Sequence, residues 1–194
     1  DLTDELHGID CVVYLAGRAH KKNETSNQSL ELHNFNNTLP AIKFARLALS
    51  SKVRRFVYIS SVAVYGENSE NKIFNELSDL HPQTAYAKSK VNAEFALKKI
   101  FFGSETELII IRPPMIYGLG APGNFGSLVK ILNLKLPLPL GGIKNSRSFL
   151  NINNFNHIIE KIIQSEVDLS GTYLISDNYD LSTSEFLRVV GQIT

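Results

Sequence analysis

The residues whose types and spacing could do chemistry are Tyr86 and Lys90, four positions apart in the segment Ala85–Lys90, AYAKSK. On a helix, residues four apart share one face, one turn from each other. A phenol ordinarily has a pKa of about 10, too high for proton transfer at neutral pH, and a nearby ammonium favours the phenolate and lowers that pKa. The spacing therefore predicts an acid/base pair. Taken alone, it also fits a packed ring beside a solvated amine.

Strand-like and helix-like segments alternate along the first part of the chain. Short apolar runs bounded by polar residues are typical of strands buried on both faces of a parallel sheet. This order predicts an α/β fold, a Rossmann-type doubly wound parallel sheet. We expect strands at Val12–Leu15, Phe56–Ser60 and Leu108–Ile111, and helices over 30–49, bent or started by Pro40, and over 85–102.

After Arg112 the sequence becomes rich in proline and glycine, which break regular secondary structure. We expect loops over an active site there. A helix near 154–165, a strand at 172–175 and a last helix capped by Ser182 and Glu185 follow. We therefore expect residues 1–120 to form the remainder of a Rossmann domain, and 121–194 part of a substrate-binding region interleaved with its sheet.

Composition narrows the class of protein. The chain has 194 residues, 43% of them hydrophobic, with a net charge of +1. That suffices for one sizeable core and argues against a nucleic-acid binder, which needs a basic surplus. No apolar run approaches the ~20 residues of a membrane span. The single cysteine, Cys11, excludes an internal disulfide and fits a reducing compartment, so we expect a cytoplasmic protein. No metal site is predicted.

Candidate site residues follow three predicted strands. Ligands of open parallel sheets bind beyond the carboxyl ends of the strands. Leu15, Ala16 and Gly17 end the first strand, Ser60 and Ser61 the second, and Arg112–Gly118 follows the third. Each segment alone reads as an ordinary turn or cap. Together with the helix of Tyr86 they predict one site.

Five motifs, in order, carry a resemblance to a known family. They are Val13–Gly17 (VYLAG, similar to HLAA), Asn34–Thr38 (NFNNT, similar to N-V-x-G-T), Ser60–Gly66 (SSVAVYG, similar to SSxxVYG), Arg112–Gly118 (RPPMIYG, similar to RPxxxYG) and Arg147–Ile152 (RSFLNI). With Tyr-x-x-x-Lys between them, the chain resembles the extended short-chain dehydrogenase/reductases over nearly its whole length. Within that family it is most similar to nucleotide-sugar epimerases and 4-keto-reductases. Asn37 stands where many relatives have glycine.

The resemblance implies hydride transfer with a nicotinamide cofactor, NAD, with NADP left open. It implies that Tyr86 exchanges a proton with the sugar oxygen, that Ser61 hydrogen-bonds that oxygen, and that Lys90 holds the nicotinamide ribose and lowers the pKa of Tyr86. Arg147 and Asn124 would bind the substrate's diphosphate. Ser61 would bind the reacting oxygen of the substrate. The implied cofactor-binding residues are Leu15, Ala16, Gly17, Asn34, Ile59, Ser60, Tyr86, Lys90, Pro113 and Met115.

Two departures from the family pattern limit the prediction. Val62 and Ala63 stand where 4,6-dehydratases carry an Asp-Glu pair, which argues against dehydration. No G-x-x-G-x-x-G or G-x-G-x-x-G stands near the start of the chain, where the family's pyrophosphate turn would be. We therefore expect an internal piece of a longer enzyme, inactive and a poor binder of NAD by itself.

Several functions stay open. The leading one is a 4-epimerase or 4-keto-reductase of a UDP-linked sugar in polysaccharide biosynthesis, a homodimer when full-length. A second is a reductase of non-nucleotide ketones such as sterols. The third is a catalytically silent NAD-binding scaffold or redox sensor, although such relatives usually lose the tyrosine or the lysine.

Overall fold

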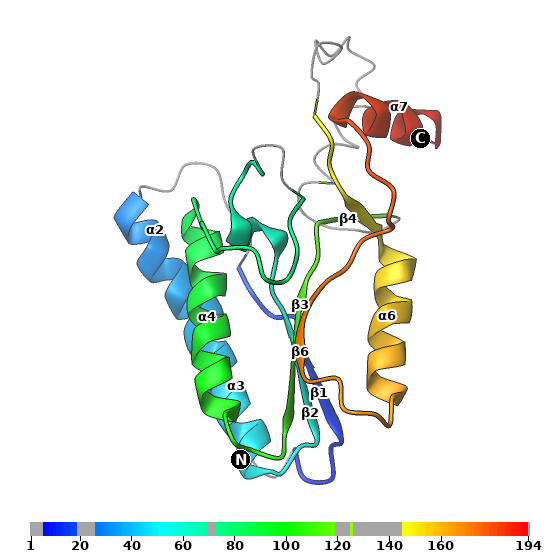
Figure 1. Ribbon diagram of the computed structural model, residues 1–194. Helices are drawn as coiled ribbons and strands as arrows, with labels where there is room; N and C mark the ends of the chain where they lie inside the picture. The colour runs from blue at the N-terminus through cyan, green and yellow to red at the C-terminus, as the bar shows by residue number, and fades with distance from the viewer. Residues whose placement is uncertain (1–5, 19–25, 70–72, 119–124, 126–144, 194) are drawn as a thin grey trace. The chain divides into compact units, whose positions relative to one another are not determined.

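The computed structural model describes residues 6–18, 26–69, 73–118, 125 and 145–193 (Figure 1). The chain divides into two compact units. The first combines Asp1–Arg112 with Ser165–Leu174, and the second combines Pro113–Gln164 with Ile175–Thr194. The boundary predicted at residue 120 lies outside the described residues and stays a prediction.

The first unit is built on a four-stranded parallel sheet in the order β1-β2-β3-β6. Its strands are β1 (Cys11–Tyr14), β2 (Arg55–Ile59), β3 (Glu107–Arg112) and β6 (Gly171–Leu174). β2 is buried along its whole length, as its continuous apolar run predicts. The predicted α/β class with a parallel sheet is confirmed.

Three helices of the first unit are α2 (Ser26–His33), α3 (Leu39–Ser50) and α4 (Ala85–Phe101). The single helix predicted over 30–49 is interrupted by a five-residue π-helix, Asn34–Thr38. Pro40 lies in the first turn of α3, where its missing N–H is tolerated. The proline thus marks the start of a second helix. The N–H of Leu39 donates to the carbonyl of Asn34 across the wider π turn.

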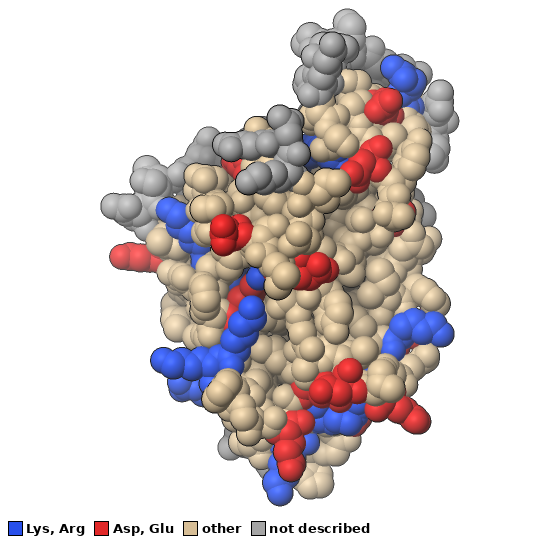
Figure 2. Space-filling view, in the orientation of Figure 1, with Lys and Arg blue, Asp and Glu red and all other residues tan. Residues whose placement is uncertain are grey.

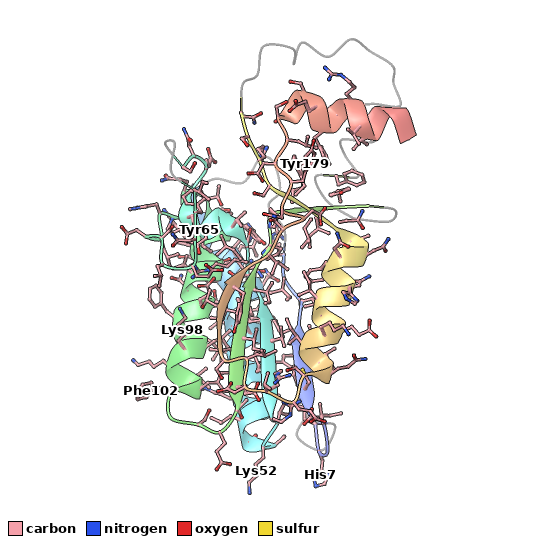
Figure 3. The ribbon with its side chains drawn as sticks, turned by 45° about the vertical axis from the view of Figure 1, so that its right-hand side comes forward. His7, Lys52, Tyr65, Lys98, Phe102 and Tyr179 are labelled. Atoms are coloured by element: carbon pink, nitrogen blue, oxygen red, sulfur yellow. The ribbon has the colours of Figure 1, made fainter. Side chains whose placement is uncertain are left out.

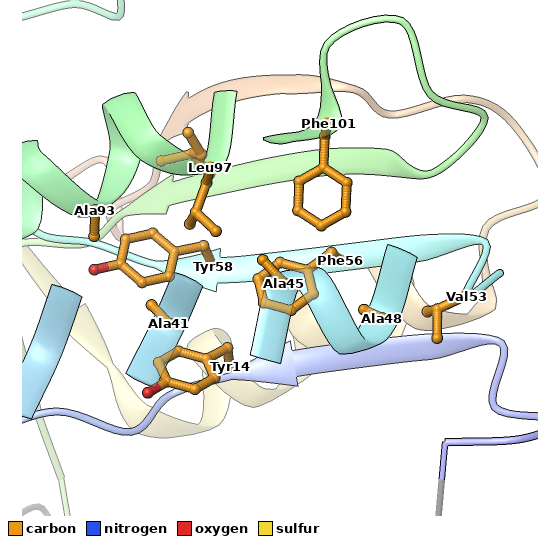
Figure 4. Packing of buried hydrophobic residues seen from close by; sticks show 11 residues of the cluster. Tyr14, Ala41, Ala45, Ala48, Val53, Phe56, Tyr58, Ala93, Leu97 and Phe101 are labelled. Carbon is orange, nitrogen blue, oxygen red and sulfur yellow. The ribbon is translucent and has the colours of Figure 1, made fainter. Parts of the chain in front are cut away.

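The core of this unit lies between the sheet and the helices α3 and α4 (Figure 4). Ala41, Ala45 and Ala48 recur along one face of α3 and are fully buried. Their small side chains leave room for the rings of Phe56 and Tyr58 from β2. This packing fixes the helices against the strand whose end carries the candidate site. The other members of the cluster are Tyr14, Val53, Ala93, Leu97, Phe101 and Ile110.

Helix α4 begins and ends where the sequence predicts. Thr84 caps its start, accepting a hydrogen bond from the N–H of Ala87 at 3.1 Å. At its other end Lys98 and Phe102 point away from the sheet (Figure 3). The buried face of α4 is therefore the one that carries Lys90.

The second unit holds a two-stranded parallel sheet, β4 (Met115–Tyr117) with β5 (Phe149–Asn151). Helices α6 (Ile152–Gln164) and α7 (Thr183–Ile193) follow. The predicted capping of α7 is confirmed: the N–H of Glu185 donates to Ser182 Oγ at 3.2 Å, and the N–H of Ser182 donates to Glu185 Oε2 at 2.8 Å. Tyr117, Phe125, Phe149 and Phe186 pack their rings together.

Charges of both signs are interspersed over the face of the molecule seen in Figure 2, in keeping with the net charge of +1. Within the described ranges, the chain forms no helix long and apolar enough to cross a membrane.

Candidate active site

Tyr86 and Lys90 lie in the first two turns of α4, beside the end of β2. The Lys90 side chain is buried, and its Nζ donates to the carbonyl oxygen of Ile59 at 2.8 Å. The same nitrogen lies 4.9 Å from the centroid of the Tyr58 ring and 5.8 Å from that of Tyr86. The predicted sharing of one helix face is confirmed.

Ser61 joins this pair from the end of β2. It caps a short 3-10 helix, Val62–Tyr65, by accepting the N–H of Ala63 at 3.2 Å. Its hydroxyl also acts on the Tyr86 phenol and favours a lower pKa of that group. Since the serine oxygen accepts from Ala63, its own hydrogen is available for the tyrosine oxygen. Ser61, Tyr86 and Lys90 are thus brought together by one strand end and one helix.

The proton affinities differ from the prediction. Burial raises the pKa of Tyr86, and only the nearby Ser61 hydroxyl opposes the rise. Burial likewise lowers the pKa of Lys90 to about 8, with Glu94 acting in the opposite direction. The predicted lowering of the Tyr86 pKa by Lys90 is therefore wrong for this structure, because both groups lose water and the amine is held on the Ile59 carbonyl.

A buried ion pair, which the sequence reading missed, anchors the same helix face. Glu94 continues the spacing of Tyr86 and Lys90 by another four residues. Its carboxylate accepts from Arg112 Nε at 3.0 Å and Arg112 Nη2 at 2.5 Å, and from Ser60 Oγ at 2.5 Å. All three residues are buried. The network ties α4 to the ends of β2 and β3, and the repeated spacing of four was the signal for it.

The strand-end loop, Leu15–Arg18, approaches Lys90 from β1. Leu15, Ala16 and Gly17 are exposed. A Cβ on Gly17 would lie 3.5 Å from Lys90 Nζ. An open stretch of backbone beside a buried amine fits a flat, polar cofactor, which needs close approach to the backbone and a hydrogen-bond donor.

Two of the three asparagines of the π-helix, Asn34 and Asn37, make different contacts. Asn34 Oδ1 accepts from Thr38 Oγ1 at 3.0 Å and from Asn92 Nδ2 at 3.1 Å, so its side chain joins the π-helix to α4. Asn37 is buried and contacts the strand-end loop through the backbone of Arg18. The sequence reading gave Asn37 no role. Its unusual position in the motif was the available signal.

The remaining predicted residues belong to the second unit. Pro113 is buried, and Met115 packs in β4 against the aromatic cluster. Arg147 is exposed, and its backbone pairs with that of Leu181. Asn124 lies outside the described residues. The roles of these four residues stay predictions.

Comparisons with known proteins agree with this architecture. Residues 1–176 match the NAD dependent epimerase/dehydratase family. The chain is 36% identical over 185 residues to a UDP-glucose 4-epimerase of Vibrio cholerae, covering 94% of this chain and 56% of that protein. It is 30% identical over 197 residues to the N-acetyl-alpha-D-glucosaminyl-diphospho-ditrans,octacis-undecaprenol 4-epimerase of Escherichia coli O157:H7, covering 98% and 56%.

Among solved structures, a UDP-glucuronic acid 4-epimerase from Bacillus cereus in complex with NAD superposes with a TM-score of 0.86 at 21% identity. The match covers 100% of this chain and 62% of that one. The protein belongs to the NAD-dependent epimerase/dehydratase family, and its fold is the Rossmann-like fold of those enzymes. The chain spans about half the length of the curated relatives it matches.

Proposed function

We propose that the full-length protein is an NAD-dependent 4-epimerase or 4-keto-reductase of a UDP-linked sugar. The observation that carries the proposal is the meeting of Ser61, Tyr86 and Lys90 beside the exposed strand-end loop. Such a cluster suits proton transfer at one oxygen of a substrate, next to a cofactor that takes the hydride.

In this proposal Tyr86 exchanges a proton with the oxygen on the sugar C4. Burial raises the pKa of Tyr86, so its phenol can donate a proton to a keto oxygen. In the opposite direction the Tyr86 phenolate takes up the proton of the C4 hydroxyl as the hydride leaves C4. Ser61 donates a hydrogen bond to the same oxygen and steadies the charge that develops there. Both side chains are half-buried, and the loss of water around them strengthens both interactions.

Lys90 and the strand-end loop would hold the cofactor. When bound, the nicotinamide supplies the hydride acceptor and donor. The Lys90 ammonium would donate to the ribose, while Leu15, Ala16 and Gly17 offer it an open backbone edge. Ile59 and Ser60 would line the same side, and Lys90 is already aimed there by the Ile59 carbonyl. Asn34, Pro113 and Met115 complete the proposed cofactor-binding set.

The substrate is assigned from charge chemistry. Arg147 is exposed and carries a planar fork that suits a diphosphate, and Asn124 would assist it. The relatives from Vibrio cholerae and Escherichia coli are by name 4-epimerases of sugar diphosphates, which favours the epimerase over the reductase. Val62 packs with the apolar cluster of Val64 and Tyr65, leaving no acid or base for dehydration at that position.

The experiment incubates the full-length enzyme with UDP-glucose or UDP-N-acetylglucosamine, with no added reductant. Conversion to the C4 epimer identifies an epimerase, because the cofactor is regenerated within one turnover. Conversion of a UDP-4-keto sugar that requires added NADH or NADPH identifies a reductase. Turnover of neither substrate, by folded protein that retains Tyr86, Ser61 and Lys90, overturns the proposal in favour of a silent scaffold.

We also propose that the full-length protein is a homodimer. Leu32, Phe35 and Leu39 form an apolar stripe at spacings of three and four, and they are 38%, 67% and 54% exposed. Phe95 on α4 is 63% exposed, and the Asn34–Asn92 hydrogen bond joins the two helices next to it. Exposed apolar side chains on two neighbouring helices suit burial against the same side chains of a second copy.

A further inference from the structure

We propose that Asn37 is a positioning residue for the cofactor, and that Gly17 is the matched partner which makes room for it. This inference rests on the proposed function, since it takes the strand-end loop as the edge that receives the cofactor. It concerns residues of the first unit only.

The amide of Asn37 holds the backbone of the strand-end loop at two points. Its Oδ1 accepts the N–H of Arg18 at 2.5 Å, and its Nδ2 donates to the carbonyl of Arg18 at 3.2 Å. One amide thus satisfies both polar groups of a single residue, as a neighbouring strand would. The pairing fixes the loop just beyond the point where β1 ends at Tyr14.

On its other side the same amide reaches the turn of α4 between Tyr86 and Lys90. Asn37 Nδ2 lies 3.0 Å from Ser89 Oγ, which in turn donates to the carbonyl of Tyr86 at 2.8 Å. The nitrogen also lies 3.3 Å from His33 Nδ1, and the His33 ring meets the Tyr86 ring edge-on at 6.1 Å between centroids. Asn37 therefore links the loop to the helix turn of the candidate acid/base pair.

Gly17 is the complement of this arrangement. A Cβ at position 17 would lie 3.3 Å from Asn37 Oδ1, closer than ordinary van der Waals contact, and 3.5 Å from Lys90 Nζ. Asn37 is fully enclosed and bonded on both sides, so its oxygen has little freedom to retreat. An alanine at 17 would push either the loop or the amide out of place. The two residues should therefore behave as a coupled pair.

The first experiment measures NADH binding to full-length protein stripped of cofactor, for the parent and for Asn37→Ala. We expect NADH to bind at least about tenfold more weakly to N37A, since two hydrogen bonds to the loop are lost. The value of kcat at saturating cofactor should fall less than the affinity does. Asn36→Ala is the matched control, because Asn36 lies in the same π-helix and its Nδ2 donates to the carbonyl of Leu32 in α2.

The second experiment is a double-mutant cycle. Gly17→Ala should weaken NADH binding by the parent. In the N37A background it should reduce the NADH affinity much less, because the Asn37 oxygen that the new methyl group would meet is gone. Gly191→Ala serves as the glycine control, since nothing lies within 4 Å of a Cβ there. If N37A does not yield folded protein, comparison of G17A with G191A still tests the predicted crowding.

The outcomes separate the two proposals. Failure of the parent protein itself to bind NADH would overturn the proposed function. Normal binding by the parent, together with N37A affinity equal to that of N36A, would overturn the positioning role of Asn37 alone. Equal effects of G17A with and without the asparagine would overturn the pairing.

Discussion

At the scale of single residues, the site is governed by burial more than by the mutual attraction of its charges. Lys90 is deprived of water, and its Nζ donates a hydrogen bond to a neutral carbonyl, that of Ile59. Its pKa falls to about 8 for this reason, although Glu94 opposes the fall. A lysine in this state can release its proton near neutral pH, which suits a residue beside a cationic nicotinamide.

The lowered pKa of Lys90 predicts a dependence of folding stability on pH. The folded pKa of about 8 lies below the ordinary value of 10.5. Between these values the unfolded chain still holds the proton that the folded chain has released, so this residue makes stability rise with pH over that window. Below about pH 8 Lys90 holds its proton in both the folded and the unfolded chain, so it does not make stability change with pH there.

Urea unfolding of cofactor-free protein checks this prediction. The parent should gain stability between about pH 8 and pH 10 relative to Lys90→Met, which cannot release a proton. Lys88→Met is the matched control, because Lys88 is exposed on the same helix and should keep the parent slope. A K90M slope equal to that of the parent would contradict the lowered pKa.

At the scale of elements, α4 is fixed to the sheet by the Glu94–Arg112 ion pair. Removal of one partner leaves the other charge buried and unpaired, which typically lowers the free energy of unfolding by about 3–5 kcal/mol. We expect Glu94→Gln to lower the free energy of unfolding by that order. The exposed Glu105→Gln is the control and should change little.

The double variant E94L/R112M tests the reason for that loss. It replaces both charges with apolar groups and should be more stable than E94Q, because no charge is left uncompensated. A double variant less stable than E94Q would show that the attraction itself, and not the stranded charge, dominates.

The sequence predicted the elements whose signals are local. Helix α4 is long, periodic and capped by Thr84, so its bounds were predicted within a residue. Strands β4 and β5 have three residues each, too few for periodicity to reveal them, and β4 also lies between Pro114 and Gly118. The π-helix lies just before Pro40, which has no N–H to continue the helical backbone hydrogen bonds. The spacing of apolar residues does not reveal this change of helical pitch.

The site shows the same division. Tyr86, Lys90 and Ser61 stand in motifs that can be read one at a time. Asn37 contacts residues 19 and 52 positions away, so its role follows only from tertiary structure. The direction of the Tyr86 pKa was predicted wrongly for a related reason, since burial depends on the whole core around it.

At the scale of the whole molecule, β1 lies at one edge of the four-stranded sheet. No glycine-rich phosphate motif stands near the start of this sequence. We therefore expect residues 1–194 by themselves to bind NAD weakly, because the pyrophosphate lacks a cradle. Isothermal calorimetry of this chain measures the affinity, and a micromolar dissociation constant would contradict the expectation.

The homodimer gives a second prediction at this scale. Light scattering on the full-length protein should report the molar mass of a dimer. Phe35→Glu should shift the molar mass toward that of a monomer, because it places a charge in the apolar stripe. Phe102→Glu is the control, because Phe102 is 90% exposed at the far end of α4. A parent monomer would rule out the homodimer, and a dimeric F35E would rule out this face as its interface.

The kcat of Tyr86→Phe in the full-length protein shows whether Tyr86 is the acid/base of a nucleotide-sugar enzyme. Loss of the phenol should lower kcat by about 10²–10⁴, the usual contribution of a positioned acid/base, while circular dichroism and NADH binding stay near those of the parent. Tyr179→Phe, which removes an exposed hydroxyl, should retain the parent rate. A folded, cofactor-binding Y86F that turns over UDP-sugar at the parent rate would contradict the account.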